Sequence, residues 1–305
     1  MRRVLSIDGG GIRGIIPAHI LAEIERETGK PCADIFDLIV GTSTGGIIAC
    51  GLGIMVSAAD LSALYEERGS EIFNRTLWHR LRSLGMLADS KYPPDGLERV
   101  LREFFRDEKL SDAETRVMVP AYEIRLRRAY FFKSWHPRYN QFALREVCRA
   151  TSAAPTYFPV ARVKDAAGED YHFWDGGLLV NNPAICALAE ARRLWPSEDI
   201  MLLSLGTGET RQPLYAEDVA HAGAVSLLGN IMETLFSGSS QISDYLCAQA
   251  SATPRVAYYR LQPDLLPGQD SMDDCGARNL ESLRAAACGV VESAKFEAAL
   301  RALAN

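Results

Sequence analysis

The sequence predicts an α/β protein whose mostly parallel sheet carries helices on both faces. Two consecutive strand-turn-helix units lead to this prediction. In the first, an apolar strand at 4–7 runs into a glycine turn at 9–11, and helical apolar spacing follows over 15–27. In the second, an apolar strand at 37–40 leads into a turn and a helix over 41–52. Right-handed crossovers between parallel strands place such helices on both faces of a sheet.

Later segments extend the predicted sheet to about six strands. Strands are expected at 116–124 and 129–133, and an apolar strand at 199–205 runs into a Gly-Thr-Gly turn. A short aromatic strand ends just before Asp175. Between 57 and 108 the apolar spacing is helical, with a loop in its middle, and this region could cover a site on the sheet.

No boundary divides the chain into separate domains. At 305 residues it can bury one large core, and it contains no repeat, linker or low-complexity segment. The part from 213 to 305 has mainly helical spacing and is expected to pack on the sheet. We therefore expect one domain over 1–305.

Charge and composition exclude several classes of function. The formal net charge of −6 offers no dense basic face to a nucleic-acid polymer. The seven cysteines are scattered without a CxxC pair, so neither a zinc site nor a disulfide framework is expected. The first apolar run stops at Asp8, and no stretch approaches the roughly 20 apolar residues of a membrane span. A cytoplasmic protein is expected, with any membrane contact made from its surface.

Ser43 is the candidate nucleophile. It is the central residue of a G-x-S-x-G run, Gly41 to Gly45, that lies between an apolar strand and a helix, which is the context of a nucleophile elbow. The two glycines permit a strained turn that exposes the hydroxyl, and the helix N-terminus behind it favours negative charge. The alternative is a glycine-rich turn whose serine only caps the helix.

A second glycine loop, at 8–14, is the candidate oxyanion hole. It matches G-x-G-x-x-G, so a dinucleotide-binding role must be weighed, but the second strand lacks the acidic residue that would hold a ribose. The consecutive N–H groups of Gly9, Gly10 and Gly11 could instead hold an oxyanion. Arg13 could add positive charge there, or could be a surface arginine paired with a carboxylate.

Asp175 is the candidate base. It follows an aromatic strand end and precedes Gly176 and Gly177, which allow close backbone approach. None of the five histidines stands in a catalytic context, although His172 is close in sequence. With an ordinary pKa of about 3.9, the carboxylate would be ionised but a weaker base than histidine, so the oxyanion hole would carry more of the catalysis. The alternative role is an Asp-Gly turn.

These three motifs, in this order, resemble the patatin-like phospholipase family. The likeness extends through residues 150–158, Asn181-Asn182-Pro183 and residues 203–208, so it covers about residues 1–210 and matches the C-terminal part only loosely.

The resemblance implies a three-layer α/β/α fold in which a Ser-Asp dyad cleaves acyl esters of membrane phospholipids and related lipids, with no metal or other cofactor. By position, Ser43 corresponds to the nucleophile and Asp175 to the dyad acid, while Gly9 to Gly11 and Arg13 correspond to the oxyanion loop. The family also includes bacterial effectors that degrade membranes when a cyclic nucleotide binds, so such an activator is a candidate partner.

Reaching a membrane requires a surface that binds lipid. Residues 77–82 mix aromatic, aliphatic and basic side chains as interfacial helices do, although a solvated helix with a buried apolar face explains the same residues. Two other classes of protein stay open on the sequence: a non-catalytic storage or interaction protein on a hydrolase fold, and a dinucleotide-binding oxidoreductase. The oligomeric state is left undetermined.

Overall fold

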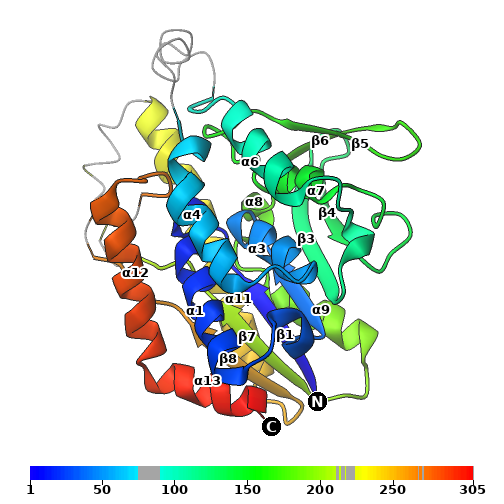
Figure 1. Ribbon diagram of the computed structural model, residues 1–305, viewed down its shortest axis with the longest axis vertical. Coiled ribbons are helices and arrows are strands. Elements are labelled where there is room, and N and C mark those ends of the chain that lie inside the picture. Colours follow the sequence, from blue (N-terminus) through cyan, green and yellow to red (C-terminus); the bar gives the residue numbers. More distant parts are fainter. Residues whose placement is uncertain are drawn as a thin grey trace.

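The protein is a central sheet between two layers of helices. The computed structural model describes residues 1–74, 90–210, 213, 217, 224–266, 268–269 and 271–304. Figure 1 shows helices α1, α3, α4 and α12 on one side of the sheet and α9 and α11 on the other. The α/β/α arrangement expected from the sequence is therefore confirmed.

Among the described residues the sheet has eight strands, seven of them in the order β5-β6-β3-β2-β1-β7-β8, and β4 pairs with β3 beside this path. The strands are β1 (Arg2–Ile7), β2 (Leu38–Gly41), β3 (Arg116–Glu123), β4 (Arg128–Lys133), β5 (Ala161–Lys164), β6 (Asp170–Asp175), β7 (Ile200–Leu205) and β8 (Val256–Leu261). The run β3-β2-β1-β7-β8 is parallel, while β4, β5 and β6 pair antiparallel.

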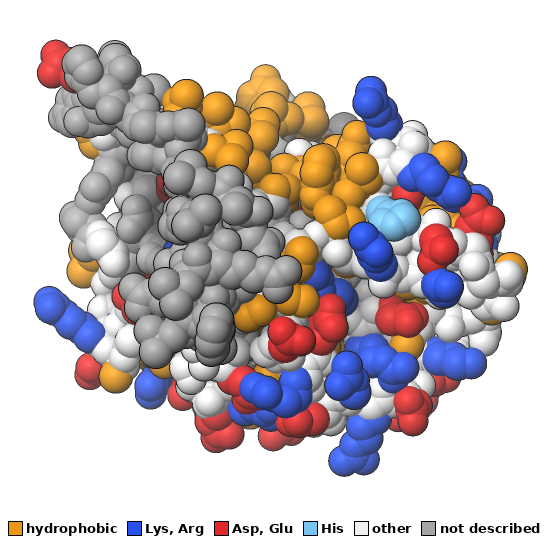
Figure 2. All heavy atoms as spheres, turned by 90° about the horizontal axis from the view of Figure 1, so that it is seen from above, with side chains coloured by type: hydrophobic (Ala, Val, Ile, Leu, Met, Phe, Trp, Pro, Cys, Tyr) orange, Lys and Arg blue, Asp and Glu red, His pale blue; other side chains and the backbone are white. Residues whose placement is uncertain are grey.

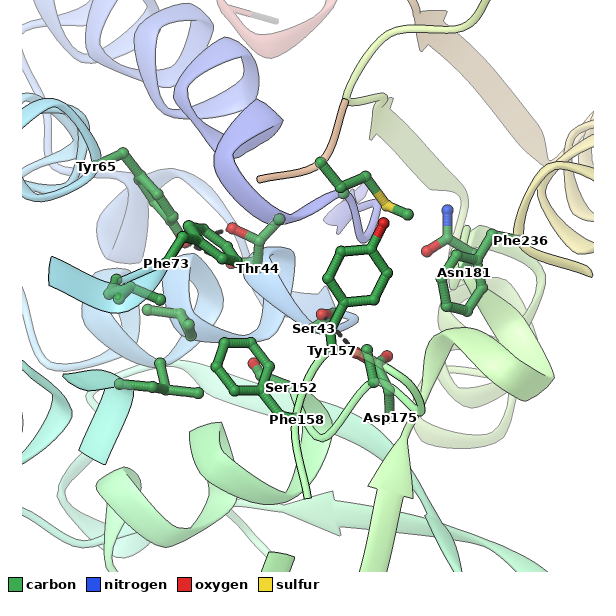
Figure 3. Close-up of a pocket in the computed structure, with 17 residues that line it drawn as sticks. Ser43, Thr44, Tyr65, Phe73, Ser152, Tyr157, Phe158, Asp175, Asn181 and Phe236 are labelled. Atoms are coloured by element: carbon green, nitrogen blue, oxygen red, sulfur yellow. Dashed lines mark hydrogen bonds between the residues drawn. The ribbon is translucent and has the colours of Figure 1, made fainter. Parts of the chain in front are cut away.

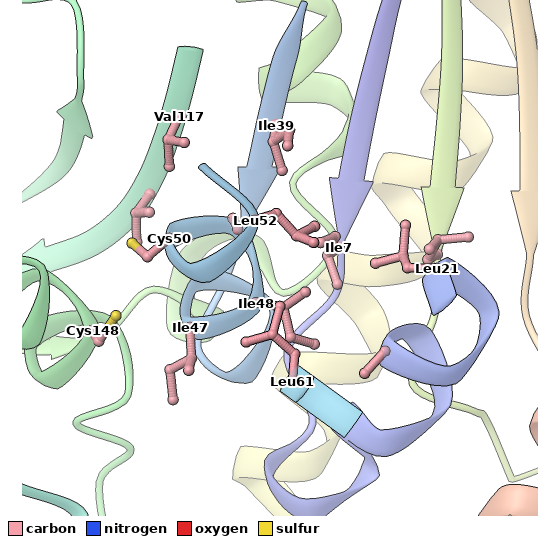
Figure 4. Close-up of a cluster of buried hydrophobic side chains, with 14 of the residues drawn as sticks. Ile7, Leu21, Ile39, Ile47, Ile48, Cys50, Leu52, Leu61, Val117 and Cys148 are labelled. Atoms are coloured by element: carbon pink, nitrogen blue, oxygen red, sulfur yellow. The ribbon is translucent and has the colours of Figure 1, made fainter. Parts of the chain in front are cut away.

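Buried parallel strands explain the apolar runs that the sequence shows. Every residue of β7 is buried, because helices cover both faces of the sheet at its centre. One hydrophobic cluster packs the sheet against α1 (Ile15–Thr28), α3 (Thr44–Gly53), α4 (Ala58–Ile72), α6 (Asp95–Phe105), α7 (Leu144–Thr151), α12 (Ala277–Val291) and α13 (Ala294–Ala304). Figure 4 shows Ile7 and Ile39 of the strands next to Ile48 and Leu52 of α3 in this cluster.

A second, smaller cluster covers the opposite face. There, α9 (Ala184–Leu194) and α11 (Ala224–Ala250) pack on β1, β2 and β7 through residues such as Val40, Leu202 and Cys247. The short helix α8 (Gly177–Val180) follows β6 and packs beside α11.

One edge of β3 is shared by two strands that approach each other end to end. Residues 116–118 pair with β2 in parallel, whereas residues 121–123 pair with β6 in antiparallel register. Pro120 lies between the two pairings, where the strand needs no N–H donor on that side. The C-terminal ends of β2 and β6 therefore meet at the middle of β3.

Two strands were not predicted from the sequence. The edge strand β5 alternates buried and exposed residues, and its exposed positions are Arg162 and Lys164. The other edge strand, β8, contains Arg260, whose guanidinium donates to both carboxylate oxygens of the buried Asp8, at 2.9 and 2.6 Å. A charged residue in each strand weakened the apolar pattern that marks a strand.

The C-terminal part shares a sheet and a core with the rest of the chain. Strand β8 pairs with β7, and Leu280, Leu283 and Phe296 of the last helices belong to the same hydrophobic cluster as β1. We therefore propose that residues 1–305 fold as one domain. Within the described ranges, no helix is both long and apolar enough to cross a bilayer.

Candidate active site

Ser43 lies in the tight turn between β2 and α3. Its backbone has φ 54° and ψ −120°, a conformation that residues other than glycine rarely adopt. Thr42 N–H donates to Ile7 O at 3.1 Å, which holds the start of the turn on β1. Ile47 N–H donates to Ser43 O at 3.1 Å and begins the helix. Such strain persists only where the surrounding structure fixes it, as in a nucleophile elbow.

Gly41 and Gly45 leave no space for a side chain. A Cβ on Gly41 would lie 1.9 Å from Gly45 O, and a Cβ on Gly45 would lie 2.3 Å from Ile7 O. The turn therefore packs directly on the end of β1. This close approach holds Ser43 beside the glycine loop at 8–14.

Asp175 is the last residue of β6. It lies next to Ser43 at the middle of β3, where the C-terminal ends of β2 and β6 approach each other. Ser43 Oγ donates a hydrogen bond to Asp175 Oδ2 at 2.7 Å, and Gly177 N–H donates to Oδ1 at 2.7 Å. The carboxylate is only 2% exposed. Figure 3 shows the two side chains pointing toward each other, as the sequence-based account requires. Their catalytic roles stay a prediction.

Burial changes the acidity of Asp175. Loss of solvent raises the pKa of Asp175 to about 7, although the hydrogen bonds from Gly177 N–H and Ser43 Oγ lower it. The ordinary value of about 3.9 assumed from the sequence is therefore wrong for this site. A carboxylate with a pKa near 7 is a base of about the strength of histidine.

Thr151, the last residue of α7, connects the two motifs. Its Oγ1 accepts from Ser43 N–H at 2.9 Å and donates to Pro120 O at 2.6 Å. Its carbonyl accepts from Gly176 N–H at 3.2 Å. A Cβ on Gly176 would lie 2.3 Å from Pro120 O, so Thr151 and Gly176 pack on the same carbonyl.

The glycine loop is held by its carbonyl groups. Gly9 O accepts from Thr207 Oγ1 at 2.7 Å and from Asn181 Nδ2 at 3.3 Å. Gly10 O accepts from Arg13 N at 3.2 Å and from Arg13 Nε at 3.4 Å. In a trans peptide unit the C=O and the next N–H point in opposite directions. These four bonds therefore fix the directions of the N–H groups of Gly10 and Gly11.

The residues expected in the oxyanion hole fall into two groups. Gly10 and Gly11 line the pocket at Ser43, and within the described ranges their N–H groups have no hydrogen-bond acceptor. Gly9 N–H instead donates to Asn181 O at 3.0 Å, so this N–H is already engaged. Arg13 bonds the loop itself and does not line the pocket. Gly10 and Gly11 thus line the pocket with N–H groups that have no acceptor among the described residues, and Arg13 holds the loop that carries them. The oxyanion hole itself stays a prediction.

The pocket above Ser43 is mostly apolar. Figure 3 shows Tyr65 and Phe73 on one side of Ser43, and Asn181 and Phe236 on the other. The first side is an apolar arm, which we define as Ile47, Tyr65, Ile72, Phe73, Leu97 and Phe158. Figure 2 looks onto this end of the molecule, where hydrophobic side chains gather in one patch and charged side chains occupy most of the remaining described surface.

Histidine takes no part in the described site. On β6, His172 and Asp175 are an odd number of residues apart, so their side chains point to opposite faces of the strand. His19 and His136 contact other residues, at Cys288 and Arg138. His79 and His221 lie outside the described residues. In the part of the chain that the structure describes, no cluster of three or more His, Cys, Asp or Glu side chains could hold a metal ion.

Fold and site together define an α/β protein of the ester hydrolase class, in which the strained Ser43 is hydrogen-bonded to the buried carboxylate of Asp175. The chain belongs to the patatin-like phospholipase family, whose model matches residues 5–188. This membership makes it a lipid ester hydrolase by family and removes the dinucleotide-binding interpretation of the loop at 8–14.

Two relatives with known names match almost the whole of this chain. A cGAMP-activated phospholipase from Pseudomonas aeruginosa is 34% identical, with 99% of this chain and 89% of the relative covered. Patatin-like protein 2 from Oryza sativa subsp. indica is 32% identical, with coverage of 93% and 82%. The crystal structure of VipD from Legionella pneumophila gives a TM-score of 0.44 at 12% identity, covering 94% of this chain and 67% of that one.

Three residues of the site had no role assigned from the sequence. Thr151, Asn181 and Thr207 belong to the stretches that carry the family likeness, but each acts through a contact more than 100 residues away in the chain. No local pattern marks such contacts. The one feature of the sequence that could have marked these three residues is that each is a small polar residue next to an apolar helix or strand.

Replacing Asp175 by Asn is expected to stabilise the protein above neutral pH. The pKa of about 7 in the folded protein exceeds the ordinary value of about 3.9, so between these pH values the folded protein binds a proton that the unfolded chain has released. The free energy of unfolding therefore falls as the pH rises through this window, by an amount on the order of 4 kcal/mol. Asp175→Asn cannot ionise and escapes this loss.

Urea unfolding at about pH 4 and at about pH 8 measures the effect. The gap between Asp175→Asn and the wild type should widen strongly at the higher pH. The fully exposed Asp107 provides the matched control, since Asp107→Asn should follow the wild type at both pH values. A gap that is the same at both pH values would contradict the buried, proton-binding carboxylate.

Proposed function

We propose that the protein is a phospholipase A type lipid acyl hydrolase in which Ser43 and Asp175 form a catalytic dyad. The hydrogen bond from Ser43 Oγ to Asp175 Oδ2, beside the open N–H groups of Gly10 and Gly11, is the observation that carries the proposal. The serine is the nucleophile, the carboxylate is its base, and the two N–H groups form the oxyanion hole.

The reaction has two halves. Asp175 takes the proton of Ser43 as Oγ bonds to the ester carbonyl carbon, and the carbonyl oxygen becomes an oxyanion. The carbon-oxygen bond to the alcohol then breaks, and the leaving alcohol takes the proton from Asp175. In the second half, Asp175 deprotonates a water molecule that attacks the acyl-enzyme. The fatty acid leaves and the proton returns to Ser43 Oγ.

Preorganisation of the oxyanion hole supports this mechanism. Thr207, Asn181 and Arg13 hold the carbonyl groups of the glycine loop, so the opposed N–H groups need no reorientation when charge develops. The N-terminus of α3 behind Ser43 adds a favourable dipole.

The apolar arm fits an acyl chain. Five of its six side chains come from α3, α4, α6 and the residue that follows α4, and Phe158 comes from the segment between α7 and β5. All six except Phe73 are buried. Burying a methylene group in such surroundings gains about 0.8 kcal/mol. We therefore propose that the acyl chain binds in this arm, while the alcohol part of the lipid leaves on the side of Asn181 and Phe236.

Lipid contact at the pocket mouth is part of the proposal. Leu179 and Val160 are exposed, and each lies two residues from a residue that lines the pocket. These side chains can enter the outer layer of a membrane while the pocket takes up one lipid. The earlier candidate for this contact, 77–82, lies outside the described residues.

Removal of either dyad member should abolish most of the activity. Ser43→Ala and Asp175→Asn are each expected to lower kcat for phospholipid hydrolysis by roughly 10³-fold or more, and the double variant should be little worse than either single one. Hydrolysis of mixed phospholipids, followed by mass spectrometry, measures this. Additive losses would contradict a dyad, and wild-type protein that shows no activity either with or without cyclic GMP-AMP would favour the storage or interaction alternative.

Narrowing the apolar arm should shift the preferred chain length. Leu97→Phe is expected to lower kcat/KM for long-chain esters by about 10-fold or more and to leave short-chain esters within about twofold. Leu101→Phe is the matched control, since Leu101 is equally buried on α6 but does not line the pocket. An equal loss for both chain lengths in Leu97→Phe would contradict acyl binding in this arm.

A cyclic nucleotide is the proposed activator. The support is the relative named cGAMP-activated phospholipase, which matches almost the whole chain. Hydrolysis of phospholipid vesicles should rise roughly 5- to 150-fold when cyclic GMP-AMP is added, the range of ordinary allosteric coupling. Ser43→Ala serves as the blank in the same assay. Equal rates with and without the nucleotide would remove this proposal and leave the hydrolase itself untouched.

A further inference from the structure

Helix α11 has a buried face and an exposed apolar face. Met232, Phe236, Ser243 and Cys247 point inward and are at most 8% exposed. A second set of apolar residues lies on another side of the helix and is 38–64% exposed. It comprises Leu227, Leu228, Ile231, Leu235, Ile242, Tyr245 and Leu246. A helix of this type that only covered the sheet would carry polar residues there.

The exposed apolar residues follow a regular spacing. Leu228, Ile231, Leu235, Gly238, Ile242 and Tyr245 are separated alternately by three and four residues. We call these six positions the α11 seam. Apolar residues at alternating intervals of three and four form the contact line between paired helices, because they repeat every 3.5 residues. The seam extends about 26 Å along the helix.

Two copies of the α11 seam fit each other when the two helices run in opposite directions. In an antiparallel pair, Leu228 of one copy faces Tyr245 of the other, Ile231 faces Ile242, and Leu235 faces Gly238. A Cβ on Gly238 would meet no atom within 4 Å, so this position is open to a large side chain from outside. In a parallel pair the two glycines would face each other and leave a gap.

We propose that the α11 seam binds the same seam of a second copy of this chain in antiparallel orientation. Such a contact is isologous, because the same patch is used on both copies around a two-fold axis. The axis passes between Leu235 and Gly238. The proposal concerns assembly and does not depend on the proposed catalytic function.

Charge favours a second copy over a lipid surface. Helices that lie on membranes are rich in Lys and Arg on their polar face, whereas α11 has neither and carries Glu233 and Asp244. Asp244 accepts from Tyr258 Oη at 2.7 Å and therefore points toward β8, away from the α11 seam. In the antiparallel register Asp244 lies level with Gly229, and Glu233 with Ser240, so no like charges are brought together.

The area of the patch also fits a dimer. With about half of each of its seven large side chains exposed, the patch measures on the order of 600 Å², at the upper end of what monomers leave uncovered. A stable dimer interface buries about 800 Å² on each partner. The area of the α11 seam together with the polar residues beside it approaches that value. We therefore expect a dimer that dissociates on dilution.

Sedimentation velocity of the full chain over a dilution series tests the proposal. The wild type should approach twice the chain mass of 33.5 kDa at high concentration. Ile242→Glu should stay monomeric over the whole series. Gln241→Glu is the matched control, because it adds the same charge at an exposed position beside the α11 seam, and it should dimerise like the wild type. Far-UV circular dichroism checks that both variants fold.

Disulfide trapping tests the orientation. In a Cys288→Ser background, the pair Leu228→Cys with Tyr245→Cys should form a covalent dimer on oxidation, whereas Leu228→Cys alone should not. Self-linking of Leu228→Cys alone would contradict the antiparallel register and indicate a parallel pair.

A wild-type chain that remains monomeric at every concentration overturns the proposal. Flotation with phosphatidylcholine vesicles then identifies the occupant. If Ile242→Glu loses vesicle binding and Gln241→Glu retains it, the α11 seam is a lipid-docking face. If neither variant changes vesicle binding, the α11 seam is not a lipid-docking face either.

Discussion

The site depends on one feature of the sheet, the edge of β3 that β2 and β6 share. Strand β2 rises along this edge and stops at Gly41, and β6 descends from the other end and stops at Asp175. Because both strands end at the middle of β3, a serine just after β2 and the carboxylate at the end of β6 meet at 2.7 Å. Thr151 stabilises this junction, because its hydroxyl group accepts a hydrogen bond from Ser43 N–H and donates one to Pro120 O.

In the proposed mechanism, burial of this junction serves catalysis at the expense of stability. The carboxylate is held out of water, which raises the pKa of Asp175 to about 7 and suits it to the proposed role of a base near neutral pH. The same burial disfavours the ionised form and so lowers stability where the enzyme would be active. The strained backbone of Ser43 adds to this cost, as is common at functional sites. Two buried elements, β1 and α3, hold the strained turn in place.

Much of the fold follows from local patterns in the sequence. Strands with continuous apolar runs, such as β1, β2 and β7, were predicted because their burial on both faces removes any alternation. Strand β8 was missed because Arg260 interrupts its pattern, and only the fold shows that this arginine pairs with buried Asp8. The sequence also predicted Ser43, Asp175 and the glycine loop as candidates, since each motif is a local turn with its own geometry, and the structure brings the three together.

Properties that arise from distant contacts were beyond the sequence. The raised pKa of Asp175 comes from burial by several elements, and the roles of Thr151, Asn181 and Thr207 come from hydrogen bonds across the molecule. A distant contact also decides which N–H groups of the glycine loop are already hydrogen-bonded. Gly9 N–H donates to the carbonyl of Asn181, which follows β6 in the chain. Of the three loop glycines, Gly10 and Gly11 are therefore the two whose N–H groups have no acceptor among the described residues.

The rate at which a fluorophosphonate labels Ser43, measured against pH by mass spectrometry of the intact protein and its peptides, tests the dyad most directly. We predict a single label on Ser43 whose rate of formation rises as Asp175 ionises, with a midpoint near pH 7, and falls to background in Asp175→Asn. Labelling of Asp175→Asn at the wild-type rate, or a label on another residue, would contradict the pairing of this serine with this carboxylate.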